Sequence, residues 1–158
     1  MASTVTHALS ASYIALTAFE VLPDERGYVL AALLAATAVD LDHLVIVVRD
    51  RQRYRTSGYV GQLHHARSPL HELLGLLIVG IAALPIYVLD PQLALILFTA
   101  FAIHIVHDWI LGRAHPLAPF DLTEVALFNL NQRQKIVIDL LTALFFGGLW
   151  IRYLNVLR

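Results

Sequence analysis

The sequence predicts an all-α polytopic membrane bundle of about five helices, and composition is the first reason. Of the 158 residues, 58% are hydrophobic and only 15% are charged, whereas an ordinary soluble domain has roughly 45–50% apolar residues. Apolar runs of the length that crosses a bilayer as a helix, about 20 residues, recur along the chain. No internal repeat or linker divides it, so residues 1–158 are expected to form a single integral membrane domain.

Charge and cysteine content restrict the function classes. The formal net charge is -1, which provides no basic field for nucleic acid, so no nucleic-acid partner is expected and membrane lipid is the expected environment. The chain has no cysteine, which excludes thiolate nucleophiles, iron–sulfur clusters and Cys-type zinc sites. The strong metal ligands that remain are carboxylates and the eight histidines.

Prolines and polar connections divide the apolar sequence into five predicted spans. The first is the most polar, because it contains His7 and Glu20, and it is interpreted as a retained helix since no Lys or Arg precedes it, as one would in a signal peptide. Pro23 and Pro91 lie between spans, where proline is tolerated. The predicted spans are 5–22, 28–48, 70–89, 93–111 and 136–157.

Basic residues gather in two of the connections. By the positive-inside rule these connections are cytoplasmic, which predicts a multi-pass protein of the inner or plasma membrane with a cytoplasmic N-terminus and a C-terminus on the other side. The basic residues are Arg49, Arg51, Arg53, Arg55 and Arg67 in the first connection and Arg113, Arg133 and Lys135 in the second.

Ionisable side chains occur within or beside the spans, where each costs roughly 2.5–3.5 kcal/mol on insertion scales and usually marks a functional site. His104 and Asp108, four residues apart, share one helical face. Asp40 and Asp42 lie roughly 200° apart in a regular helix and cannot both bind one ion, so one of them is expected to orient a ligand instead. The topology brings these groups together near the cytoplasmic leaflet. The set is His7, Asp40, Asp42, His43, His64, His65, His71, Glu72, His104, His107 and Asp108.

Other interpretations compete with a metal site. A single histidine in a span is more often hydrogen-bonded to a neighbouring helix, which is the favoured interpretation of His107, His64 or His115 taken alone. Paired Asp and His groups also suit a proton relay or an ion path, and two intramembrane histidines can bind haem. Haem is disfavoured because carboxylates accompany the histidines. Asp40, Glu72 and Asp139 are candidates for orienting a ligating histidine.

The order of these motifs resembles that of the YdjM-like family of inner-membrane, metal-dependent hydrolases, also described as LexA-binding hydrolases. The matching residues run from Thr6-His7 through Asp40-Leu41-Asp42-His43 and the 65–71 stretch to His104-x-x-x-Asp108 and Pro119-Phe120. The resemblance implies relation to zinc-dependent phospholipase C and single-strand nucleases, whose metal ligands correspond by position to His7, Asp42, His65, His104 and Asp108. Because the 64–71 stretch departs from the family pattern, the choice among His64, His65 and His71 stays open.

The sequence and the resemblance together predict a metal-dependent hydrolase with one or two divalent ions, Zn²⁺ being favoured, acting on a phosphoester of a lipid or lipid-linked substrate at the cytoplasmic leaflet. A non-enzymatic carrier or sensor of metal or protons is the alternative. The expected ligands are His7, Asp42, His65, His71, His104 and Asp108; the expected proton acceptors are Asp40 and Glu72; and the expected substrate contacts are Arg67, Arg113, His43 and His115.

Overall fold

The computed structural model describes residues 3–41 and 69–155. Within them the chain is helical, with five α-helices and one short 3₁₀ helix, and its only β pairing is a bridge between Ala114 and Val125. The predicted all-α class and helix number are confirmed for these residues. The helices are α1 (Thr4–Ala18), α2 (Arg26–Ala38), α5 (Leu73–Leu89), α6 (Pro91–Leu111) and α7 (Gln132–Asn155), with the 3₁₀ helix η2 (Pro69–His71) before α5.

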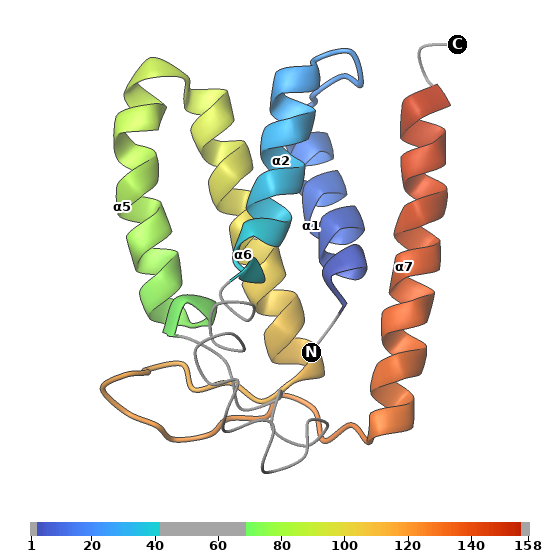
Figure 1. Ribbon diagram of the computed structural model, residues 1–158. Coiled ribbons are helices and arrows are strands. Elements are labelled where there is room, and N and C mark those ends of the chain that lie inside the picture. Colours follow the sequence, from blue (N-terminus) through green and yellow to red (C-terminus); the bar gives the residue numbers. More distant parts are fainter. Residues whose placement is uncertain (1–2, 42–68, 156–158) are drawn as a thin grey trace.

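The helices run alternately up and down (Figure 1). The starts of α1, α5 and α7 and the end of α6 lie toward the lower end in Figure 1, whereas the 19–25 connection and the turn at Asp90 lie at the upper end. This alternation puts the start of α1 and the end of α7 at opposite ends of the bundle.

The first helix is shorter than its predicted span because a capping motif stops it. The Ser3 side chain accepts from the backbone N–H of Thr6 at the start. At the end, Glu20 adopts a left-handed backbone with φ 54°. The N–H of Glu20 donates to the carbonyl of Thr17, and that of Val21 donates to the carbonyl of Leu16. This pair of bonds is the Schellman arrangement, which ends α1 at Ala18 rather than at residue 22.

The connection between α5 and α6 is a single residue. Asp90 caps α6 by accepting from the backbone N–H of Leu93 at 2.9 Å, and it also accepts from the Tyr28 hydroxyl at 3.1 Å. Pro91 is therefore the first residue of α6 and not part of a connection, which corrects the predicted start at residue 93. Proline fits there because the first helical N–H has no partner within the helix.

Helices α1, α2 and α6 form the centre of the bundle around small side chains, including Ala11, Ala32 and Ala100, which are fully buried. Helix α7 packs on α1, where the Trp150 indole donates to the carbonyl of Leu9 at 2.9 Å and the Tyr153 hydroxyl donates to that of Val21. Small residues allow close approach of helix backbones, as in membrane bundles. This packing sets the relative position of the three central helices.

Two of the described helices are long and apolar enough to cross a membrane, α6 with 21 residues and α7 with 24. Helices α2 and α5 are apolar but shorter. Large apolar side chains remain exposed on the outer faces of α5 and α7, such as Leu84, Val88, Leu141 and Leu144. Length and composition therefore support two spans, and the expectation of five spans stays a prediction.

Candidate metal centre

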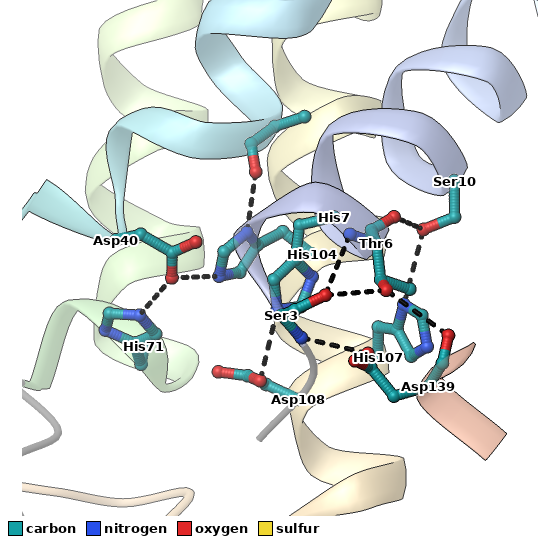
Figure 2. Close-up of polar contacts among 11 residues, drawn as sticks. Ser3, Thr6, His7, Ser10, Asp40, His71, His104, His107, Asp108 and Asp139 are labelled. Atoms are coloured by element: carbon teal, nitrogen blue, oxygen red, sulfur yellow. Dashed lines mark hydrogen bonds and ion pairs between the residues drawn. The ribbon is translucent and has the colours of Figure 1, made fainter. Parts of the chain in front are cut away.

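Five ionisable side chains meet in the lower half of the bundle (Figure 2). We call them the His/Asp cluster. They come from four separate segments: one from α1, one from the turn after α2, one from η2 and two from α6. All but one are at most 1% exposed, and the exception, Asp40, is 14% exposed. The members are His7, Asp40, His71, His104 and Asp108.

Carboxylates and imidazoles alternate through the cluster at short distances. The Nε2 atom of His7 lies 3.3 Å from Oδ1 of Asp108. Asp40 Oδ1 lies 3.5 Å from Nε2 of His104 and 3.8 Å from Nε2 of His71. The rings of His7 and His104 are stacked, with centroids 3.7 Å apart. The predicted convergence of His7, His104 and Asp108 is thus present in the structure, and His71 joins them.

The orientation of His104 is fixed by the backbone of α2. Its Nδ1 lies 2.7 Å from the carbonyl oxygen of Ala36, and because a carbonyl can only accept, Nδ1 carries the proton. In a neutral ring Nε2 is then an acceptor, yet it faces the carboxylate of Asp40. Two acceptors that face each other in this way need either a proton, on the ring or on the carboxyl group, or a metal ion between them.

Two groups of three residues have ligand atoms close enough to share an ion. In each group these atoms lie within 4.8 Å of one another. One group is His7, Asp40 and His104, and the other is His71, His104 and Asp108. His104 belongs to both but has one ring nitrogen left after its bond to Ala36. Among the described residues, it can therefore complete only one group at a time.

Asp40 belongs to the cluster for a reason that the geometry of a regular helix did not predict. The comparison of Asp40 with Asp42 assumed one regular helix through both residues. Helix α2 instead ends at Ala38, and Asp40 lies in a turn in which its N–H donates to the carbonyl of Thr37. The turn aims Asp40 at His71 and His104 (Figure 2), so its carboxylate is a candidate ligand as well as the expected proton acceptor.

Glu72 is buried beside the cluster, at 1% exposure. Its Oε2 accepts from the indole N–H of Trp109 at 3.0 Å, and its Oε1 accepts from the backbone N–H of His115 at 2.9 Å. The carboxylate expected to accept a proton thus already accepts two hydrogen bonds. Trp109 was not singled out by sequence reasoning, although a buried indole N–H usually has a partner.

His107 and Asp139 belong to a second polar network next to the cluster (Figure 2). The Ser10 hydroxyl donates to the carbonyl of Thr6, so it accepts from Nδ1 of His107 at 3.3 Å. Asp139 on α7 accepts from the backbone N–H of Ser3 at 2.9 Å. The bond between His107 and α1 agrees with the interpretation of His107 as a histidine that joins two helices.

The segment after α6 carries two expected substrate contacts. Arg113 pairs with Glu124 at 2.9 Å, and both side chains are largely exposed. The ring Nδ1 of His115 donates to the carbonyl of Leu122 at 2.9 Å. Nearby, hydrogen bonds from the side chain and backbone of Thr123 hold the pKa of Asp121 below its usual value. These contacts close the segment on itself.

Four residues of the predicted site lie outside the described residues: Asp42 and His65, expected as ligands, and His43 and Arg67, expected to contact substrate.

Comparison with known proteins gives one finding. No curated protein and no solved structure matches the chain. The model of the YdjM inner membrane protein family matches residues 1–157, almost the whole length. Together with the helical bundle and the ordered His and Asp residues, this match shows that the chain belongs to the YdjM inner membrane protein family.

Proposed function

We propose that this protein is a membrane-embedded metal-dependent hydrolase that uses Zn²⁺ and cleaves a phosphoester of a lipid or lipid-linked substrate at the cytoplasmic leaflet. The observation that carries the proposal is the pair of buried acceptors formed by Nε2 of His104 and the carboxylate of Asp40. Imidazole and carboxylate are the ligands that Zn²⁺ takes when no cysteine is present. The choice of phosphoesters rests on the resemblance to zinc-dependent phospholipase C and single-strand nucleases.

The environment of the cluster favours a site open to one side. Above the cluster, toward the 19–25 connection, the facing surfaces of the central helices are apolar and fully buried, with Ala15, Leu16, Ala32 and Ile96 among them. A carrier of protons or metal needs polar access from both sides of the membrane. The packed apolar half therefore supports an enzyme over the carrier alternative.

In this proposal the residues of the cluster divide two tasks. A bound Zn²⁺ supplies a Lewis acid and lowers the pKa of a coordinated water toward about 7. His104 serves as the shared ligand, since Ala36 fixes its ring. If the ion is held by His71, His104 and Asp108, then Asp40 is the carboxylate left to accept a proton; in the other group Asp108 takes that task. Arg113 at the same end is the candidate for binding phosphate.

The test compares two histidines on the same helix. His104→Gln removes the residue shared by both candidate groups, whereas His107→Gln changes a histidine that bonds Ser10. Purified protein in detergent is stripped with a chelator, reloaded with Zn²⁺, and measured for zinc per chain and for turnover of phosphodiester and phospholipid substrates. We expect His104→Gln to lose both and His107→Gln to keep both.

Wild-type protein that binds no zinc would contradict the metal site. Protein that binds zinc and hydrolyses no phosphoester, but moves protons or metal ions across vesicle membranes, would support the carrier instead. The proposed orientation is tested separately by reporters fused to the C-terminus. If a C-terminal reporter that works only in the cytoplasm is active, a cytoplasmic N-terminus is overturned, because the start of α1 and the end of α7 lie at opposite ends of the bundle.

A further inference from the structure

Glu72 connects three segments through one buried carboxylate. It begins α5 as its N-cap residue, yet its side chain makes no capping bond to that helix. It reaches instead to Trp109 on α6 and to the backbone of His115 beyond α6. Each carboxylate oxygen receives one N–H donor, and hydrogen bonds to a charged acceptor are stronger than neutral ones. Glu72 therefore joins the start of α5, the end of α6 and the following segment.

The positions of the two side chains in the sequence give this bond a second consequence. Glu72 directly follows His71, and Trp109 directly follows Asp108. His71 and Asp108 belong to the same candidate metal group. The bond between Glu72 and Trp109 thus ties together the residues next to two members of that group, which restrains the separation of the two ligands.

The hydrogen bond between the backbone N–H of His115 and the carboxylate of Glu72 restrains the segment after α6. Residue 115 follows Ala114, which pairs with Val125 through two backbone hydrogen bonds of 2.8 Å. The segment is therefore closed on itself and attached to the bundle at Glu72. Arg113, the candidate for phosphate binding, lies two residues before the attachment point.

From these contacts we infer that Glu72 is a positioning residue, which holds His71 and the 112–131 segment in register with Asp108, and is not the proton acceptor. The inference rests on the proposed metal-dependent function and deepens it. A carboxylate is required because both partners are N–H donors, whereas glutamine would turn its NH₂ group toward one of them. Loss of either bond leaves a buried donor or acceptor without a partner.

The experiment uses Glu72→Gln, Trp109→Phe and the double variant in the full-length protein. Zinc affinity is measured by competition with a chromogenic chelator, and the d–d spectrum of the Co²⁺-loaded protein reports ligand geometry. We expect each single variant to weaken zinc binding by about 10–100-fold, the usual effect of losing a residue that orients a ligand. Because both variants disturb the contacts of the same carboxylate, the double variant should lose less than the product of the two factors.

Glu124→Gln is the matched control, since it makes the same change in an exposed ion pair of the neighbouring segment, and it should leave zinc affinity unchanged. The pH dependence of turnover separates positioning from proton transfer. A positioning role keeps the shape of the wild-type profile in Glu72→Gln, whereas loss of one limb of the profile would overturn the inference. Wild-type zinc affinity and an unchanged Co²⁺ spectrum in Glu72→Gln would also overturn it.

Failure of the proposed function gives a different result. If the wild-type protein binds neither Zn²⁺ nor Co²⁺, the proposed metal site is wrong, but the positioning role of Glu72 can still be tested. In that case the imidazole resonances of His71 are compared by NMR in metal-free wild-type, Glu72→Gln and Trp109→Phe proteins. A positioning role predicts that Glu72→Gln and Trp109→Phe both shift these resonances and that Glu124→Gln does not. Resonances that stay unchanged in Glu72→Gln and Trp109→Phe would overturn the inference.

Discussion

The upper and lower halves of the bundle are built on the same faces of the same helices. The buried face of α6 runs through Ile96 and Ala100 to His104 and Asp108, at steps of four residues. On α1 the same spacing leads from Ala15 through Ala11 to His7, and on α2 it leads from Ala32 through Ala36 to Asp40 in the following turn. Each face thus changes from apolar to ionisable at one level of the bundle.

The two halves differ in the kinds of side chain that they bury. Close packing around alanines in the upper half gains dispersion contacts without burying an ionisable group. The lower half buries carboxylates and imidazoles, which are costly without a compensating cation or full hydrogen bonding. The upper half therefore fixes the helices in a register that the lower half would not maintain by itself. Variants on the two sides of this boundary should separate stability from metal binding.

The largest effect is expected at Gly75, which sets the position of η2. A methyl group at Gly75 would collide with the carbonyl oxygen of Leu70, a backbone atom that cannot move without moving η2. Gly75→Ala should destabilise the protein by about 3 kcal/mol in unfolding titrations and weaken zinc binding, because His71 belongs to η2. Gly80→Ala is the control, since its nearest contact is a side-chain atom of Phe98 at 3.5 Å. Equal stability of the two variants would contradict this explanation.

The second-largest effect is expected at Ile96, in the apolar upper half of the bundle. Ile96 is fully buried, two turns above His104 on the same face of α6. Ile96→Ala should lower the free energy of unfolding by about 2 kcal/mol, because it leaves a cavity that close packing does not refill. Zinc affinity of the folded protein should remain within about twofold of wild type. A loss of affinity as large as that of a cluster variant would show that the halves are not separable.

The third effect, expected for Asp40→Asn, tests the ionisable lower half of the bundle. The amide can donate to Nε2 of His104, which the carboxylate now faces as a second acceptor. The metal-free protein should therefore keep or gain stability, whereas the zinc-induced rise in melting temperature should shrink, with zinc affinity lower by at least about tenfold. Asp139→Asn, at a carboxylate that accepts from the backbone of Ser3, should leave zinc affinity unchanged. A less stable metal-free Asp40→Asn protein would argue that the cluster itself holds the fold.

The smallest effect is expected at Glu20, in the turn that ends α1 at the upper end of the bundle. Glu20 has a left-handed backbone, which favours glycine in the capping motif that ends α1. Glu20→Gly should raise the free energy of unfolding by about 1 kcal/mol without altering zinc affinity. Thermal unfolding in detergent measures the first quantity, and a decrease in melting temperature would mean that the side chain makes a contact worth more than the strain.

The sequence by itself determined the helices and part of the cluster. Apolar runs bounded by prolines predicted all five, because helix formation in an apolar chain follows from local composition. The spacing of His104 and Asp108 predicted a shared face, since both lie inside one regular helix. The family match over residues 1–157 agrees with the resemblance carried by the same motifs.

Only the tertiary structure decided which groups meet between helices. Asp40 joined the cluster because α2 ends at Ala38 and the following turn brings its carboxylate to His71 and His104, which lie on other segments. Glu72 turned from the cluster toward Trp109 and His115, which are 37 and 43 residues away in sequence. The shared use of His104 follows from its bond to a carbonyl on another helix. Pairings over such distances are set by how the helices pack, so local patterns cannot specify them.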